Sequence, residues 1–106
     1  MKNKNIIITG ASQGLGYELA KVFSKNGAKL FLTSRNLKNL KDLKNSCYSK
    51  SKHKIFQHDL SDLNKISLVT NEAKIFFKNK IDVVVHVAGG GLGMREVDLN
   101  HADLLK

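Results

Sequence analysis

Short apolar runs alternate with longer amphipathic stretches along this chain of 106 residues. Runs rich in β-branched and aromatic residues predict strands over residues 6–8, 29–33, 55–56 and 81–88. Between them, apolar residues recur at helical spacing over residues 15–25, from Leu37 to Leu43, and over residues 66–77. Strands alternating with helices predict an α/β fold with a Rossmann-type, doubly wound parallel sheet of strand order 3-2-1-4.

Capping residues mark the ends of the predicted helices. Gly27 follows the first helix and is suited to a left-handed cap. Asn36 precedes the second helix and Ser61 or Asp62 the third, and each side chain can accept a hydrogen bond from a first-turn amide. These positions give each helix a defined beginning or end.

The last part of the chain is rich in glycine. Glycines at positions 89–91 and 93 predict a flexible loop, and residues 96–106 read as the beginning of another helix. In the order 3-2-1-4 the strand with the valine run 83–85 would then be an exposed apolar edge. We therefore expect the isolated chain to be poorly soluble or partly unfolded.

Three glycines punctuate the turn between the first strand and the first helix. Gly10, Gly14 and Gly16 have the spacing G-x-x-x-G-x-G, which differs from the common dinucleotide pattern G-x-G-x-x-G. A glycine turn at a helix N-terminus points backbone N–H groups at an anion and lets a pyrophosphate approach the backbone closely. The turn thus predicts a phosphate-binding site.

The segment Thr9-Gly10-Ala11-Ser12-Gln13-Gly14-Leu15-Gly16 resembles the cofactor motif T-G-x-x-x-G-x-G of the short-chain dehydrogenase/reductase family. The resemblance covers the whole chain but only the N-terminal two-fifths or so of a typical member. It implies a protein that binds a nicotinamide dinucleotide and transfers hydride between it and a carbonyl or alcohol substrate. The residues that would then hold the pyrophosphate are Gly10, Ser12, Gln13, Gly14, Leu15 and Gly16.

The end of the second strand bears on the choice of cofactor. A carboxylate there would bind the ribose 2′-hydroxyl of NAD, but this chain has Ser34 followed by Arg35. A guanidinium can pair with a 2′-phosphate, and family members with a basic residue here generally prefer NADPH. We expect NADP(H) rather than NAD(H), with a solvated loop role for Arg35 as the alternative.

Two further pairs of residues match the family at strand ends. The resemblance implies that Asp59 and Leu60 bind adenine, although Asp59 could equally be a plain helix cap. It also implies that Ala88 and Gly89 lie against the cofactor ribose.

The fourth strand departs from the family just before that point. His86 and Val87 stand where the family usually has two asparagines that brace the central sheet. The departure puts the local hydrogen bonding of the sheet in doubt. A titrating role for His86 and a structural one both remain open.

No catalytic residue can be assigned in this chain. The family uses a Tyr-x-x-x-Lys pair that follows a fifth strand, beyond Lys106. Two local matches, Tyr17 with Lys21 and Tyr48 with Lys52, fall in unsuitable places. A non-catalytic nucleotide-binding or interaction module is therefore an alternative, whereas a methyltransferase-like domain would want an acidic residue where Ser34 and Arg35 stand.

Composition narrows the remaining function classes. The net charge of +9 invites nucleic-acid binding, but the lysines are scattered and arginine is scarce, so we expect solvated faces and no nucleic-acid partner.

The N-terminus lacks a signal peptide pattern and no apolar run could span a membrane, which predicts a cytoplasmic protein. The lone Cys47 excludes an internal disulfide, and no metal site is expected. We expect residues 1–106 to form one domain. The resemblance implies that homo-oligomers would form only through the segments that follow these residues in family members.

Overall fold

The computed structural model describes residues 2–11, 14–59, 66–88 and 91–96, which form one sheet flanked by helices. Its strands are β1 (Asn5–Thr9), β2 (Lys29–Ser34), β3 (Lys54–Gln57), β4 (Val83–Ala88) and β5 (Gly91–Glu96). Strands β1 to β4 are parallel, and the full order is β3-β2-β1-β4-β5. The predicted order 3-2-1-4 is confirmed.

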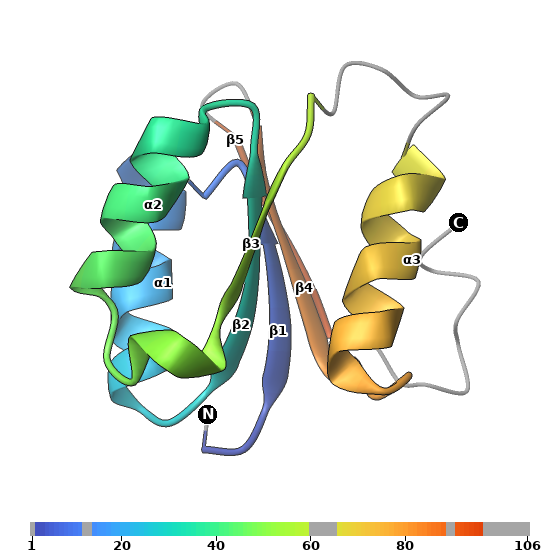
Figure 1. Cartoon of the computed structure of the whole chain (residues 1–106), viewed down its shortest axis with the longest axis horizontal. Coiled ribbons are helices and arrows are strands. Elements are labelled where there is room, and N and C mark those ends of the chain that lie inside the picture. Colours follow the sequence, from blue (N-terminus) through green and yellow to red (C-terminus); the bar gives the residue numbers. More distant parts are fainter. Residues whose placement is uncertain (1, 12–13, 60–65, 89–90, 97–106) are drawn as a thin grey trace.

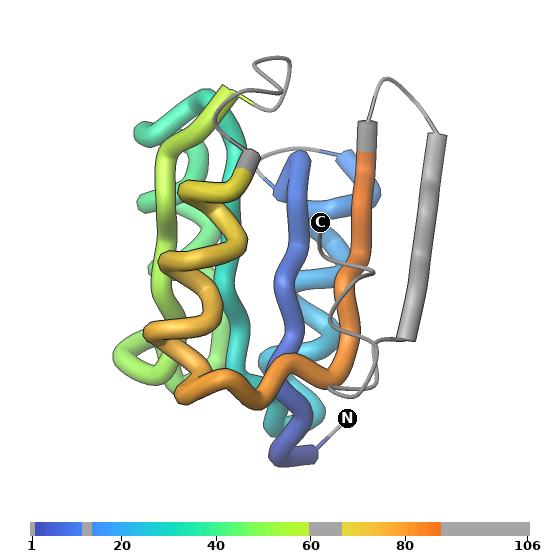
Figure 2. Tube along the Cα trace, turned by 90° about the vertical axis from the view of Figure 1, so that its right-hand side faces the viewer, coloured from blue at the N-terminus to red at the C-terminus, as the bar shows by residue number. Residues whose placement is uncertain are grey.

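Helices cover both faces of this sheet (Figure 1). Helices α1 (Gly14–Lys25) and α2 (Leu37–Ser46) lie on one face, and α3 (Ile66–Phe77) lies on the other. A short 3₁₀ helix, η1 (Lys50–Lys52), precedes β3. In Figure 2, which looks onto the α3 side, α3 lies in front of β2 and β3 and to one side of β4. This is the doubly wound arrangement expected of alternating strands and helices.

Side-chain alternation in β1 divides the apolar interior into two clusters. Ile6 and Ile8 point toward α1 and α2, whereas Ile7 points toward α3. On the α3 side, Phe31 packs against Phe77 and other aromatic rings at centroid distances of 6.1 to 6.5 Å. The uninterrupted Ile6–Ile8 run is therefore a strand buried on both faces, as its composition predicts.

The apolar face of α1 is narrower than its sequence suggests. The helix buries Gly16, Ala20, Phe23 and Ser24, whereas Val22 is 52% exposed. Val22 lies two positions after Ala20, about 200° around the helix, and so points away from the sheet. Leu68 of α3 is likewise about half exposed. Helical spacing of apolar residues therefore does not place these two side chains in the core.

Two of the predicted caps are present in the described part of the chain. Gly27 has φ +90°, and the Ala28 N–H donates to the Phe23 carbonyl at 3.0 Å, the pattern of a Schellman motif. Asn36 Oδ1 accepts the Asn39 N–H at 3.0 Å at the start of α2. The proposed caps Ser61 and Asp62 lie outside the described residues.

The glycine-rich segment after β4 differs from its prediction. Residues 91–96 form β5, which pairs antiparallel with β4 from Val83↔Glu96 to Ala88↔Gly91. The loop predicted at Gly91 and Gly93, and the helix predicted to begin at Glu96, are therefore wrong at those residues, while residues 97–106 lie outside the description. The β4 edge has unpaired backbone groups that any extended segment can satisfy, and β5 does so. The expectation of an exposed β4 edge is corrected accordingly.

Backbone and side-chain hydrogen bonds tie the start of β1 to the start of β4. The Asn5 N–H donates to Asp82 Oδ2 at 2.8 Å, and the Asp82 N–H donates to the Asn5 carbonyl at 2.9 Å. Asn5 Nδ2 also donates to the Lys80 carbonyl at 2.6 Å. Asp82, which directly precedes β4, thus holds the start of that strand beside Asn5, 77 positions earlier in the sequence.

His53 forms a buried link between β2 and the segment before β3. Its Nδ1 accepts the Leu30 N–H at 3.1 Å, so Nε2 carries the proton and donates to the Tyr48 carbonyl at 2.7 Å. The ring is 3% exposed. Burial lowers the pKa of His53, and the nearby positive charges of Lys52 and Lys44 act in the same direction. The fold therefore requires the neutral imidazole.

We predict that this requirement makes stability fall in acid. The unfolded chain has the higher pKa, about 6.5, so stability is full above that pH and falls as the pH drops below it. His53→Asn keeps an acceptor for the Leu30 N–H but cannot be protonated. It should cost about 1–3 kcal/mol at pH 8 and show a smaller loss of Tm between pH 8 and pH 5.

Ile8→Val is the control for this measurement. It removes one buried methyl group, should cost about 1 kcal/mol, and should keep the wild-type pH dependence. If His53→Asn loses Tm on acidification as steeply as the wild type does, the assignment of the acid sensitivity to His53 is wrong.

Candidate functional site

The carboxyl ends of the parallel strands meet at one edge of the sheet, the upper edge in Figure 1. From β1 the chain winds through β2 to β3 on one side, whereas β4 lies on the other side of β1. Between β1 and β4 the strand order therefore reverses. In open α/β sheets such a switch point is where ligands bind, outside the carboxyl ends of the strands.

Gly10 lies at the switch point and is in close contact with β4. A Cβ atom on Gly10 would come within 2.0 Å of the Val87 carbonyl oxygen, and its φ of +68° also favours glycine. A Cβ on Gly16 would lie 2.6 Å from the Gly10 carbonyl oxygen. These two glycines let β1, β4 and the start of α1 approach one another.

Gly14 differs from the other two glycines of the turn. It has φ +59°, and apart from its chain neighbours and the backbone of its own helix, no described residue has a heavy atom within 4 Å of the position that its Cβ would occupy. It begins α1, whose first turn has no acidic residue, and its neighbour Leu15 is 47% exposed. The first N–H groups of a helix have no partner within the helix, and the helix dipole makes this end positive. The turn thus offers open space and N–H donors to an anion.

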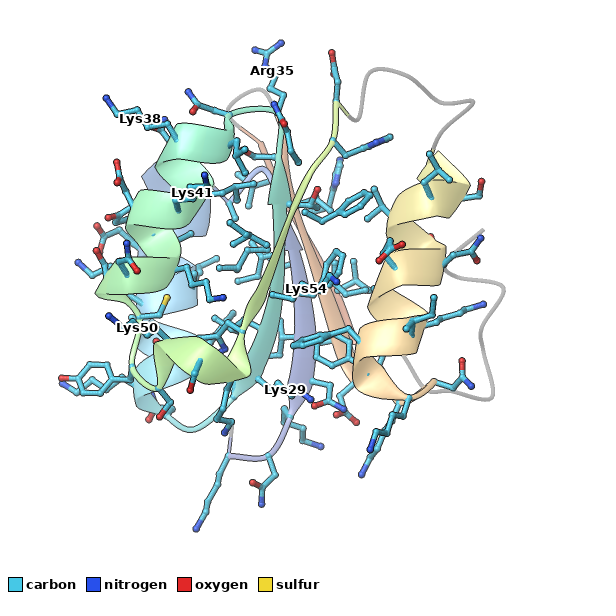
Figure 3. All side chains as sticks on the ribbon, viewed as in Figure 1. Lys29, Arg35, Lys38, Lys41, Lys50 and Lys54 are labelled. Atoms are coloured by element: carbon cyan, nitrogen blue, oxygen red, sulfur yellow. The ribbon has the colours of Figure 1, made fainter. Side chains whose placement is uncertain are left out.

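The end of β2 presents one strong positive charge. Ser34 is buried, and its Oγ accepts the Asn36 N–H at 3.1 Å, which fixes the turn into α2. Arg35 extends from this turn above the carboxyl edge, with Lys38 of α2 on the same side (Figure 3). Arg35 is exposed, and no described residue forms an ion pair with its guanidinium. The guanidinium is therefore available to an anionic ligand.

The end of β3 lies next to the end of β2. The His58 N–H donates to the Ser34 carbonyl at 2.8 Å, and the exposed Asp59 follows. Gln57 Nε2 donates to the Arg35 carbonyl at 3.0 Å. These bonds bring Asp59 to the same edge as Arg35, as expected of strands that end together.

Three polar side chains form a row on the α3 side of the carboxyl edge. Thr33, Thr9 and His86 are register partners on β2, β1 and β4. Thr9 Oγ1 and His86 Nδ1 are 2.5 Å apart and hydrogen-bonded. Thr33 Oγ1 is buried, as is the nearby His58 Nε2, and neither has a partner among the described residues. Sequence reasoning had missed this row, although alternation from Phe31 and Ile7 predicts the two threonines on one face.

The two tyrosines and the cysteine belong to the α1–α2 side of the fold. Tyr17 OH lies 3.3 Å from Ser46 Oγ of α2, and its ring is near Lys21 Nζ. Tyr48 is exposed beside η1. Cys47 is buried, and burial raises the pKa of its thiol, which disfavours the reactive thiolate.

The remaining predicted site residues fall in or beside the segments that the structure leaves undescribed. Ser12, Gln13, Leu60 and Gly89 lie outside the described residues, and Ala88 is described only as the last residue of β4. Across the described ranges, His, Cys, Asp and Glu side chains form no group of three or more that could hold a metal ion. In the same ranges, no helix has the length and apolar character needed to cross a membrane.

A parallel sheet with a glycine turn at its switch point defines a Rossmann-type nucleotide-binding protein. A family model described as short chain dehydrogenase matches residues 4–104. The chain therefore belongs to the short-chain dehydrogenase/reductase family, as the motif from Thr9 to Gly16 implied.

Individual relatives agree with this assignment. The chain is 36% identical over 94 residues to mouse dehydrogenase/reductase SDR family member 7B, covering 84% of this chain and 29% of that protein. The apo-form of glucose dehydrogenase of Caenorhabditis elegans matches with a TM-score of 0.76 and 26% identity, over 85% of this chain and 39% of the other. A 3-ketoacyl-(acyl-carrier-protein) reductase from Brucella melitensis complexed with NADH matches with a TM-score of 0.69 and 25% identity, over 78% of this chain and 33% of the other. The chain thus spans about a third of the length of its relatives.

We predict that the two left-handed glycines of the turn differ in their tolerance of a methyl group. Gly14→Ala should cost about 1–2 kcal/mol, the cost of left-handed backbone alone. Gly10→Ala adds a clash with the Val87 carbonyl and should cost at least twice as much. Urea denaturation of both variants measures the difference. Equal losses would show that β1 and β4 do not approach as closely as described.

Proposed function

We propose that residues 1–106 form one dinucleotide-binding unit, the NADP(H)-binding part of a short-chain oxidoreductase. The observation that carries the proposal is the open, left-handed Gly14 at the N-terminus of α1, beside the β1–β4 switch point. A pyrophosphate needs open space, N–H donors and the positive end of a helix dipole, and this turn has all three. Family membership supports the same conclusion.

The remaining parts of the cofactor would extend along the carboxyl edge from this turn. Gly10, Ser12, Gln13, Gly14, Leu15 and Gly16 would hold the pyrophosphate. Asp59 and Leu60 would bind adenine, and the backbone of Ala88 and Gly89 would lie against a ribose. The neighbouring ends of β2 and β3 favour one adenosine site, because Arg35 and Asp59 flank the same part of the edge.

Arg35 is our basis for preferring NADP(H) to NAD(H). Its exposed guanidinium has no ion-pair partner among the described residues, and Ser34 supplies no carboxylate that would repel a 2′-phosphate. Bidentate pairing of a guanidinium with a phosphate is strong and specific. The Brucella melitensis reductase is in complex with NADH, so the fold alone does not determine the preference.

Hydride transfer between the bound nicotinamide and a carbonyl or alcohol is the reaction that we infer for the intact enzyme. The present residues would bind and orient the cofactor for that reaction. A second candidate is a nucleotide-binding module without turnover. It is favoured by the surroundings of the two tyrosines of these 106 residues, because the Tyr17 hydroxyl contacts Ser46 of α2 and Tyr48 is exposed beside η1.

We predict that the chain binds NADPH more tightly than NADH and that Arg35→Ala narrows the difference. Loss of a charge-assisted contact should weaken NADPH binding about tenfold and leave NADH binding nearly unchanged. Isothermal titration calorimetry with both cofactors measures the effect. Arg35→Lys, which keeps the charge but not the planar fork, should lie between the two.

The control is Lys50→Ala, which removes a positive charge from η1, at a distance from Arg35 (Figure 3). It should leave the ratio of the two affinities unchanged. Equal affinity of the wild-type chain for NADPH and NADH would contradict the assigned preference. Oxidation of NADPH with a panel of carbonyl compounds then separates the two candidates, because binding without turnover favours the module.

A further inference from the structure

The hydrogen-bonded pair of Thr9 and His86 lies at the switch point of the sheet. The two residues are register partners on β1 and β4, and each directly precedes one member of the Gly10–Val87 contact. Thr9 is buried, whereas His86 is exposed. The pair therefore consists of a fixed hydroxyl and an imidazole that solvent or a ligand can reach.

The exposure of His86 follows from the layers of the fold. Val84 belongs to the α3-side cluster, so His86, two positions later on β4, faces the same side. Helix α3 lies over β2 and β3 rather than over β4 (Figure 2). Of its register partners, Thr9 has no charge and Gly93 of β5 has no side chain. The ring thus lies at the carboxyl edge with its Nε2 atom uncommitted among the described residues.

The hydrogen bond with Thr9 determines whether Nε2 of His86 is a donor or an acceptor. If the Thr9 hydroxyl donates to Nδ1, the neutral ring must carry its proton on Nε2, which becomes a donor. The 2.5 Å contact also restricts rotation of the ring. An oriented N–H donor at the switch point suits an oxygen of the ligand that binds there.

We propose that His86 is a cofactor-binding residue of this chain, donating a hydrogen bond from Nε2 to a phosphate or ribose oxygen of the dinucleotide, with Thr9 as its positioning residue. The proposal rests on the proposed dinucleotide function. In the family an asparagine usually stands at this position and braces the sheet. The side-chain amide of an asparagine can reach the Thr9 hydroxyl as Nδ1 of His86 does. It is too short to place a second donor where Nε2 of His86 lies.

That difference in length separates ligand binding from bracing alone. His86→Asn keeps a partner for the Thr9 hydroxyl and removes the distal donor. His86→Gln places an amide N–H near the position of Nε2. Thr9→Val keeps the shape of the threonine but removes the hydroxyl that orients the ring.

The test is calorimetric titration of the full chain and each variant with NADPH, with the Tm measured in parallel. We expect His86→Asn to weaken binding about tenfold at an unchanged Tm, as for one hydrogen bond to a charged oxygen. His86→Gln should restore most of the affinity, and Thr9→Val should lose several-fold. Lys50→Gln, which removes a charge from η1, should bind as the wild type does.

Failure of this inference is distinguishable from failure of the proposed function. A wild-type chain that binds neither NADPH nor NADH contradicts both. If the wild-type chain binds NADPH and His86→Asn binds it equally well, only the ligand-binding role of His86 is contradicted. His86 would then be a bracing residue.

Nitrogen NMR of the imidazole gives a readout that does not depend on affinity. In the free protein we expect the tautomer of His86 with its proton on Nε2, and NADPH should shift the Nε2 resonance more than that of Nδ1. A free-state proton on Nδ1 would mean that the ring donates to Thr9, and would overturn the assignment of Nε2 as donor.

Discussion

The close approach of β1 and β4 at Gly10 is the constraint on which the rest of this structure depends. Gly10 has no Cβ atom, so the Val87 carbonyl can occupy the space where one would be. As a result, β1 can turn into α1 directly beside the end of β4. Gly16 then lets the helix begin against the same turn. The helix dipole of α1 and its first backbone amides are thereby directed at the switch point. The candidate site therefore depends on the absence of side chains at Gly10 and Gly16.

Local patterns were sufficient to predict most of the fold. Alternation and β-branched composition located four strands, and the glycine spacing located the turn. The pattern could not predict β5, because glycines such as Gly91 and Gly93 have no intrinsic preference for a strand. Their conformation depends on the hydrogen-bonding edge of β4, which is a tertiary feature. The exposure of Val22 could not be predicted either, because the twelve-residue α1 touches the sheet along a narrow line.

Polar residues of the site were harder to predict than apolar ones. The position of Arg35 and Asp59 at the carboxyl edge could be predicted because strand ends are recognisable in the sequence. The partners of Thr9, His53 and His86 could not, because each depends on a residue that is distant in sequence. A buried histidine such as His53 and an exposed one such as His86 look alike in sequence, but the first is a structural link and the second is accessible to a ligand.

The bonds between Asn5 and Asp82 have a consequence for how the chain is made. Among the described strands, the central strand β1 is synthesised before the others, and it can pair with β2 once Lys29–Ser34 has emerged from the ribosome. Its other edge must wait for β4, 77 positions after Asn5 at the Asp82 contact. During that interval an apolar isoleucine strand has one row of free backbone groups, the kind of edge on which misassembly and chaperone capture occur. The order of strands that creates the switch point thus also delays the closure of the sheet during translation.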